Sequence, residues 1–396
     1  MASPSKWKYL ISFFVAVAAI TGLIIWKPDY AWNIISVAFG FCLGSIGVYF
    51  LGVLRRSTED YNKVISDVKF LRKRNYDECN RMDFVFNGVK INDYFDCCHK
   101  GDGKRIKIID DKTKAFELDG LITNSFFTLM KSHGGSFKQN KPTVRLDDYG
   151  MINDQLVLKT SRSTYFNHLA TNRAIDCFIE GHLTLRDIYE PGPKLSPLKE
   201  SKMSNHIGVN IFVTIDKNGK RYLILPKRSK ESTIAKGLVT SSVASRLVID
   251  RFDDDLNGEE TVPFAKQISS LVREKLGICC EKADRLETVF LGFGRNLYEG
   301  GKPQFYYWVK FPQCDEGLYS FFLESVHCQT RKDQLDADTG LMIVDISTLK
   351  YVGDDTFKAL RITSRKEKRT YFTVEKSFLA NLFLYGDIVS SQSEKP

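Results

Sequence analysis

The chain has 396 residues, of which 43% are hydrophobic and 27% are charged, and its formal net charge is +9 at pH 7. This composition is too polar for a transporter that is embedded in the membrane along its whole length, and the positive charge favours partners that carry phosphate or anionic headgroups. The 9 cysteines are an odd number without a Cys-x-x-Cys pair, which indicates neither a disulfide framework nor a zinc site.

Two long apolar segments come first in the chain. Segment 7–26 carries one charge, Lys8, and segment 31–54 carries none. A helix of about 20 apolar residues crosses about 30 Å of hydrocarbon, so these segments predict a transmembrane hairpin. Lys6 and Lys8 stand at the start of the first segment and Arg55 and Arg56 follow the second, whereas the link between the segments has only Lys27. This distribution predicts that both termini are cytoplasmic. A cleaved signal peptide followed by one anchor is the alternative, although the first apolar run is longer than a usual signal core.

Small residues follow one face of the second apolar segment. Gly40, Gly44 and Gly52 are spaced so that helix backbones can approach closely, which predicts an oligomerisation face. Packing inside the hairpin explains the same pattern, and both interpretations stay open. The charged segment 57–76 has a helical pattern with a short apolar stripe, typical of a juxtamembrane helix that packs on its own domain or pairs between subunits.

The rest of the chain alternates between strand-like and helix-like patterns. A buried strand at 208–215 is followed by an Asn218-Gly219 turn, a signal for a β-hairpin. Residues 264–276 predict a helix, and the segments 357–360 and 372–385 predict closing helices. We therefore expect five parts: a transmembrane hairpin at 1–56, a juxtamembrane helix at 57–76, an N-terminal α/β subdomain at 77–203, a larger domain at 204–387, and a polar tail at 388–396.

The order of hairpin, strand, acidic loop and a helix that ends in Arg-Glu-Lys-Leu-Gly-Ile at 273–278 resembles the Nudix fold. That family's motif reads G-x5-E-x7-R-E-U-x-E-E-x-G-U, where U is aliphatic. The resemblance implies an α+β domain with a mixed sheet and flanking helices, anchored by the N-terminal hairpin. Aligned on its final glycine, the motif places its arginine on Ser270, its first helix glutamate on Leu271, and its last acidic pair on Glu274 and Lys275.

These replacements bear on the chemistry that the resemblance implies. Nudix hydrolysis needs Mg²⁺ held by several carboxylates on one helix face, and Leu271 and Lys275 cannot supply them. We therefore assign no catalytic residue and expect ligand binding without a cofactor. The alternative is a membrane-anchored, Mg-dependent Nudix hydrolase of a nucleoside diphosphate derivative, in which Glu274 holds the metal with Glu259 or Glu260.

Segments rich in hydroxyl, amide and arginine groups, such as 159–166 and 204–210, resemble motifs of longer bacterial Nudix-like proteins. Capping and turn chemistry is the other interpretation of such groups. The strand at 304–308 is expected to place Phe305 and Tyr307 on one face and Tyr306 on the other. The expected ligand-binding residues are Arg162, Tyr165, Asn210, Arg228, Ser241, Glu274, Lys275, Arg295, Asn296 and Tyr306.

Two membrane helices joined to a degenerate Nudix-like domain resemble the membrane effectors of bacterial cyclic-oligonucleotide (CBASS) anti-phage systems. The resemblance implies a two-pass protein of the bacterial inner membrane that binds a cyclic oligonucleotide or another nucleotide, forms a homo-oligomer and disrupts or permeabilises the lipid bilayer in antiviral defence. No DNA partner is expected, because no motif of a DNA reader is visible. The ligand, the number of subunits and the choice between pore and rupture stay open.

Overall fold

The computed structural model describes residues 76–91, 93, 95–131, 140–180, 183–229, 235, 237–247, 256–276, 286–311, 340–362 and 367–393. The chain divides into two compact units, Met1–Lys63 and Val64–Pro396, and every described residue belongs to the second unit. The two predicted membrane helices lie outside the described residues, together with Gly40, Gly44 and Gly52.

The expected membrane anchor requires a correction. In the part of the chain that the structure describes, no helix is long and apolar enough to cross a membrane. The longest described helix, α11 (Lys376–Ser393), carries Lys376, Asn381 and Asp387 among its apolar residues and packs against the sheet. The structure supports a mixed, sheet-rich fold with few helices. The expected α+β fold anchored by a transmembrane hairpin is therefore wrong by this finding, and so is the two-pass inner-membrane localisation.

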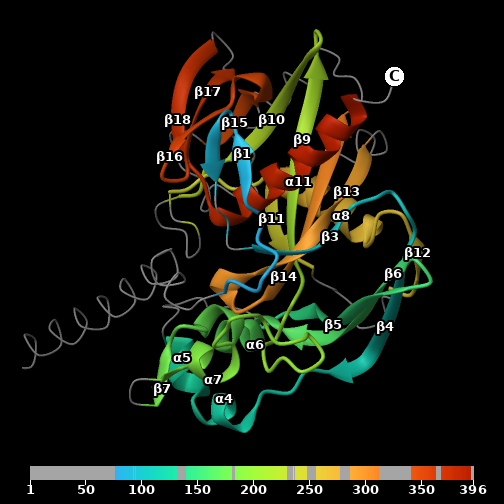
Figure 1. Cartoon of the computed structure of the whole chain (residues 1–396), viewed down its shortest axis with the longest axis vertical. Helices are drawn as coiled ribbons and strands as arrows, with labels where there is room; N and C mark the ends of the chain where they lie inside the picture. Colours follow the sequence, from blue (N-terminus) through green and yellow to red (C-terminus); the bar gives the residue numbers. More distant parts are fainter. Residues whose placement is uncertain are drawn as a thin grey trace, which may run out of the picture. The chain divides into compact units, whose positions relative to one another are not determined.

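The main sheet has 10 strands in the order β16-β17-β15-β10-β9-β14-β13-β3, with β11 paired to β9 and β18 paired to β17 (Figure 1). It is mixed, because β14 runs parallel to β9 while the other neighbours are antiparallel. The strands are β3 (Phe95–Lys100), β9 (Gly208–Lys217), β10 (Lys220–Pro226), β11 (Val243–Arg246), β13 (Glu287–Asn296), β14 (Lys302–Phe311), β15 (Leu341–Asp345), β16 (Lys350–Gly353), β17 (Thr356–Ile362) and β18 (Glu367–Thr373).

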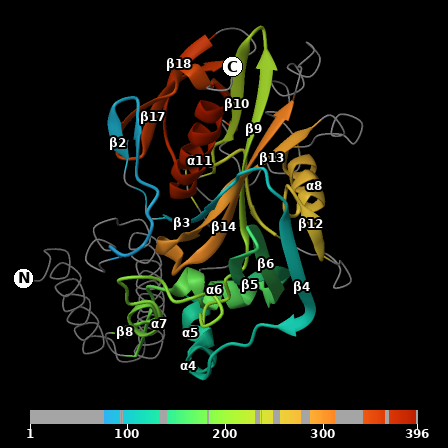
Figure 2. The ribbon, with the colours of Figure 1, turned by 45° about the vertical axis from the view of Figure 1, so that its right-hand side comes forward.

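Local sequence explains much of this sheet. Asn218 and Gly219 have φ values of 52° and 71° in the turn between β9 and β10, which confirms the predicted hairpin. The aromatic strand β14 alternates as expected. Phe305 and Tyr307 share a core with α8 (Ala265–Leu276), whereas Tyr306 packs in the core that α11 covers. The main sheet is therefore enclosed between α8 and α11 (Figure 2).

One of the two expected closing helices is a strand, and the other begins later than expected. Residues 357–360 belong to strand β17, whereas 372–373 end strand β18 and the helix expected at 372–385 is α11, which begins at Lys376. In β17, Phe357 and Ala359 are buried while Lys358 between them is only half-buried. This alternation has the period of 2 that is typical of a half-buried strand. A segment of four residues is too short for the sequence pattern to separate a period of 2 from the helical period.

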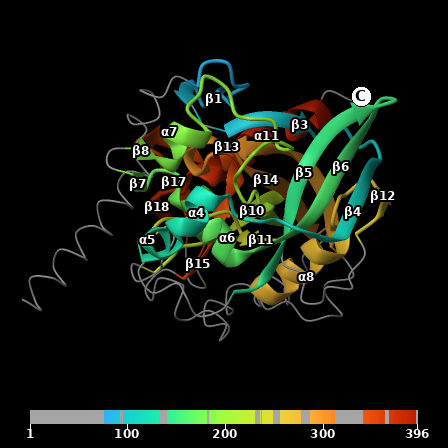
Figure 3. The ribbon, with the colours of Figure 1, turned by 90° about the horizontal axis from the view of Figure 1, so that it is seen from below.

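A second sheet of four strands has the order β12-β4-β6-β5 (Figure 3). The strands are β4 (Ile106–Ala115), β5 (Pro142–Ile152), β6 (Gln155–Thr164) and β12 (Gly258–Glu260). Ile108 and Leu158 from this sheet share one core with Val209 and Phe264. Residues from both sides of the expected boundary between 203 and 204 therefore share one hydrophobic core.

A cluster of short helices has a core of its own around Ile122, Leu169 and Leu185. The hairpin of β1 and β2 packs elsewhere, because Phe86 meets Phe357 of β17 at 5.9 Å between ring centroids. These elements are α4 (Gly120–Asn124), α5 (Phe126–Lys131), α6 (Tyr165–Ala170), η2 (Asn172–Ala174), β7 (Phe178–Glu180), β8 (Leu183–Thr184), α7 (Leu185–Tyr189), β1 (Phe84–Phe86) and β2 (Val89–Ile91).

Candidate functional site

Polar residues collect where β9 and β14 begin and β11 ends, on the side of the main sheet that α11 covers. Asn210 lies directly opposite Ala244 in the β9–β11 ladder, and its Oδ1 accepts a hydrogen bond of 3.0 Å from Ser377 of α11. Directly paired residues of an antiparallel ladder share a face, and residues two apart on a strand also share it. Arg246, two residues after Ala244, therefore lies on the same face.

Gly208 gives this face room for a polar side chain. A Cβ atom at this position would lie 2.1 Å from Oε1 of Gln304, which pairs with Gly208 across the parallel β9–β14 ladder. Because glycine has no Cβ, Gln304 extends over the strand, and its Oε1 accepts a hydrogen bond of 2.9 Å from Nδ2 of Asn210. Asn210 therefore has its amide groups committed within the protein.

Two asparagines join the helix cluster to the main sheet beside this face. Nδ2 of Asn172 in η2 donates to the carbonyl oxygen of Glu299 at 2.9 Å, and Oδ1 of Asn172 accepts from the backbone N–H of Asn205 at 2.8 Å. Glu299 ends the turn η3 (Leu297–Glu299), which connects β13 to β14. These bonds fix His206, the residue after Asn205, next to the start of β14.

Glu299 lies between two cations. Its carboxylate oxygens are 3.0 Å from Nη1 of Arg173 and 3.1 Å from Nζ of Lys302. Burial raises the pKa of Glu299, but the attraction of Lys302 and Arg173 outweighs burial and lowers it to about 2. Glu299 is therefore ionised at neutral pH, and its single negative charge is shared between two positive charges.

His206 is buried beside these charges. Its ring stacks on that of His168 with 3.8 Å between centroids, and its Nδ1 has no hydrogen-bond partner among the described residues. Burial is the main cause that lowers the pKa of His206 well below its usual value, and the neighbouring His168, Lys302 and Arg246 lower it further. His206 is therefore neutral in the protein at neutral pH, and its buried Nδ1 atom makes no hydrogen bond in the described residues.

Arg246 completes the arrangement. Its guanidinium lies 4.4 Å from the centroid of the Tyr165 ring, and both residues are half-buried. Within the described part of the chain its guanidinium has no hydrogen-bond acceptor and no carboxylate partner, and its Nε is buried. Burial lowers the pKa of Arg246. We refer to Tyr165, Arg173, His206, Arg246, Glu299 and Lys302 as the Arg246 cluster.

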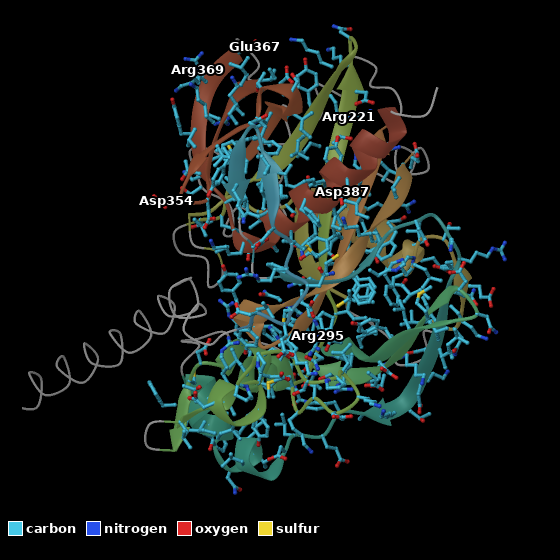
Figure 4. The ribbon with its side chains drawn as sticks, in the orientation of Figure 1. Arg221, Arg295, Asp354, Glu367, Arg369 and Asp387 are labelled. Carbon is cyan, nitrogen blue, oxygen red and sulfur yellow. The ribbon has the colours of Figure 1, made fainter. Side chains whose placement is uncertain are left out.

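Of the ligand-binding residues expected from sequence, Tyr165 lies in this cluster and Asn296 borders it. Oδ1 of Asn296 accepts from the backbone N–H of Tyr298 at 2.9 Å and so caps η3. Arg295 lies in the interior near the helix cluster (Figure 4) and donates to the carbonyl oxygens of Gly301 at 3.0 Å and Ser196 at 2.7 Å. Its Nη2 is buried and has no partner in the described residues.

Two further expected residues, Ser241 and Tyr306, lie beneath α11, and Arg228 lies near Glu375, which precedes that helix. Oγ of Ser241 accepts a hydrogen bond of 3.2 Å from Nδ2 of Asn381 on α11, beside the network of Asn210. Tyr306 is fully buried, and its ring meets Phe95 edge to face. Arg228 is half-buried, and burial lowers its pKa against the attraction of Glu375.

Arg162 lies away from these residues, in the four-stranded sheet. It forms two parallel hydrogen bonds with the carboxylate of Asp110, of 2.7 Å and 2.8 Å. The side chains of Arg162 and Asp110 are 3% and 0% exposed, so this is a buried pair inside the fold. Its geometry is that of a structural ion pair between β4 and β6.

Glu274 and Lys275 lie on α8, which covers the other face of the main sheet, and they pair with each other. The side chain of Glu274 is 61% exposed. Glu260 accepts from the backbone N–H of Ala265 at 3.5 Å, at the other end of α8 and about 14 Å along its axis from Glu274. The described residues contain no group of three or more His, Cys, Asp or Glu side chains that could hold a metal ion.

Sequence reasoning missed five members of the cluster: Arg173, His206, Arg246, Glu299 and Lys302. His206 stood inside the segment 204–210 that suggested a ligand site, which was the one available signal. An arginine without an acceptor has no sequence signature, because the missing partner is a property of the folded structure. No protein-family model matches this chain, and no curated protein matches it.

Proposed function

We propose that this chain binds a nucleotide signal through its phosphate at the Arg246 cluster and acts as a sensor. The observation that carries the proposal is the guanidinium of Arg246, half-buried against Tyr165 and without an acceptor in the described residues. Removing a charged group from water is costly unless a partner replaces the lost hydration. A phosphate supplies that partner, because its oxygens match the parallel N–H groups of a guanidinium.

The charges around Arg246 favour an anion. Arg173, Lys302 and Arg246 bring three positive charges together, and the carboxylate of Glu299 bonds to Arg173 and Lys302, whereas Arg246 has no carboxylate partner in the described residues. The unused Nδ1 of His206 is a further polar atom for a bound ligand. Arg246 and Tyr165 are half-buried, so a ligand can reach them from solvent, while the neighbouring Lys302 and His206 are buried.

The nucleotide part of the proposal rests on the resemblance of the α8 region to the Nudix motif. A main sheet enclosed between α8 and α11 is consistent with that resemblance. A base can stack on an aromatic ring or on a guanidinium plane, and Tyr165 with Arg246 offers both surfaces. The phosphate would then accept hydrogen bonds from the N–H groups of Arg246, near the positive charges of Lys302 and Arg173.

Thermal unfolding of the full chain with cyclic dinucleotides, cyclic trinucleotides and ADP-ribose tests the proposal. A ligand at 100 times its dissociation constant should add about 2.7 kcal/mol of stability. The Arg246→Gln variant should lose this gain. Arg105→Gln is a matched control, because Arg105 is exposed and has no ion pair in the described structure.

Equal stabilisation of the wild type and Arg246→Gln by the same nucleotide would place the ligand elsewhere. A ligand that stabilises the protein only when it carries a phosphate supports the cluster as an anion site. Turnover of ADP-ribose with Mg²⁺ that disappears in Glu274→Gln would replace the sensor by the hydrolase.

A further inference from the structure

The strands β16, β17 and β18 form one end of the main sheet and have two different faces. On one face Phe357 and Phe372 are buried, and Phe357 contacts Phe378 of α11 at 5.6 Å between ring centroids. The other face is exposed at the outer strands, where Tyr371 is 61% exposed and Val352 is 51% exposed, whereas Ile362 beside β15 packs against the core that α8 covers. An open sheet face next to a packed one is available for a partner.

The register places cations next to the exposed tyrosine. Lys350 of β16 pairs with Lys358 of β17, and Lys358 pairs with Tyr371 of β18, so the three side chains form a row across the strands. Nζ of Lys358 lies 5.8 Å from the centroid of the Tyr371 ring. Arg369 lies two residues before Tyr371 on the same strand and therefore on the same face. We call Lys350, Lys358, Arg369 and Tyr371 the basic face.

The charges of the basic face are unbalanced. In the described residues none of its three cations forms an ion pair, and Lys350 and Lys358 lie directly opposite each other. Like charges in directly opposed positions destabilise a sheet. Glu367, two residues before Arg369 on β18, lies on the same face, toward the outer end of the strand (Figure 4), and forms no ion pair in the described residues, so three cations face one carboxylate. An anionic partner would relieve this repulsion.

We propose that the basic face binds single-stranded nucleic acid, with backbone phosphates on Lys350, Lys358 and Arg369 and one base stacked on Tyr371. Single strands are held by cations that follow the backbone and by aromatic rings that stack on bases, and an open sheet face offers both in one plane. This mode needs no motif of a duplex reader, so it is compatible with the absence of one from the sequence. The surface is separate from the Arg246 cluster and does not rest on the nucleotide-sensor proposal.

Fluorescence anisotropy of labelled 15-mers of oligo-dT and oligo-rU with the full chain tests this proposal. Three phosphate contacts predict that affinity falls roughly 20-fold between 50 and 200 mM salt, from a slope of about 0.7 per contact. Replacing Lys350, Lys358 and Arg369 by Gln should remove this salt dependence and weaken binding at low salt more than 10-fold, roughly. The matched control replaces Lys107, Lys112 and Lys194, three exposed lysines outside this sheet, by Gln and should bind as the wild type does.

The tyrosine separates base stacking from a purely electrostatic contact. Tyr371→Ala should weaken oligonucleotide binding about 5-fold or more, whereas Tyr371→Phe keeps the ring and should bind normally. Arg246→Gln should also bind normally, which distinguishes this surface from the nucleotide site. Oligonucleotide binding that the triple Gln variant and the matched control share equally would overturn the proposal. Binding to phosphatidylserine vesicles that depends on these cations, with no oligonucleotide binding, would overturn it in favour of a lipid surface.

Discussion

Arg186 and Arg246 both contact the helix cluster, yet their surroundings are opposite. Arg186 on α7 donates to both carboxylate oxygens of Asp176 at 2.6 Å and 2.9 Å, and to the carbonyl oxygens of Leu297 and Tyr298 at 2.8 Å and 3.0 Å. Arg246 is half-buried and has only the ring of Tyr165 beside it in the described structure. The supply of hydrogen-bond acceptors therefore separates the structural Arg186 from Arg246, which is open to a ligand.

The pKa directions express the same difference. Burial lowers the pKa of Arg186, but the attraction of Asp176 and its hydrogen bonds outweigh burial and raise it. Burial lowers the pKa of Arg246, and only the ring of Tyr165 opposes this effect. The surroundings of Arg186 are complete without a ligand, and those of Arg246 lack the anion that would complete them.

The largest effect is expected at Arg186. Arg186→Gln leaves the carboxylate of Asp176, whose side chain is 2% exposed, without its cation. Breaking a buried ion pair by removing one partner should cost about 3–5 kcal/mol of unfolding free energy. Guanidinium denaturation of the wild type and the variant, followed by circular dichroism, measures this loss.

The reason for that loss can be checked separately. If the buried charge of Asp176 causes most of the penalty, the double variant Arg186→Gln, Asp176→Asn should recover part of the stability, because the amide carries no charge. A double variant less stable than Arg186→Gln alone would show that other hydrogen bonds of Asp176 matter more than its charge.

The same comparison shows what sequence could predict. The Asn218-Gly219 hairpin, the alternation of the aromatic strand β14 and the helix near 264–276 follow from local patterns, and the structure confirms them. Arg162 and Tyr165 are three residues apart in one suggestive segment, yet only Tyr165 lies in the Arg246 cluster. Arg162 pairs with Asp110, which is 52 residues away in sequence and reaches it through the parallel pairing of β4 with β6. No local pattern contains that information.

The next effect concerns the pH dependence of stability. The folded protein holds His206 with a pKa well below its usual value, while the unfolded chain has a histidine pKa of about 6.5. As pH falls below about 6.5 the unfolded chain takes up a proton that the folded protein refuses, so stability should fall by up to about 1.4 kcal/mol per pH unit. The fall stops once the pH passes the lower folded pKa.

Chemical denaturation of the wild type and His206→Gln between pH 5 and pH 8 measures this slope. The variant should lose less stability between pH 7 and pH 5, because glutamine does not titrate, and the two proteins should run parallel above pH 7. Inorganic phosphate should reduce the slope of the wild type, because an anion next to His206 favours its protonated form. Identical slopes in the two proteins would show that His206 does not govern the acid sensitivity.

The smallest effect is expected at Arg246, and it is the sharpest test of the comparison. Arg246→Gln removes the contact with the Tyr165 ring, worth about 0.5–1 kcal/mol at exposed sites. It also removes a half-buried charge that has no counterion in the described residues, which is a gain. Because the two terms oppose each other, the unfolding free energy should stay within about 0.5 kcal/mol of the wild type.

Denaturation of Arg246→Gln in parallel with Arg186→Gln, with and without added phosphate, measures both predictions at once. Phosphate should raise the midpoint of the wild type and of Arg186→Gln but not that of Arg246→Gln. A loss at Arg246 as large as that at Arg186 would mean that Arg246 is a structural residue.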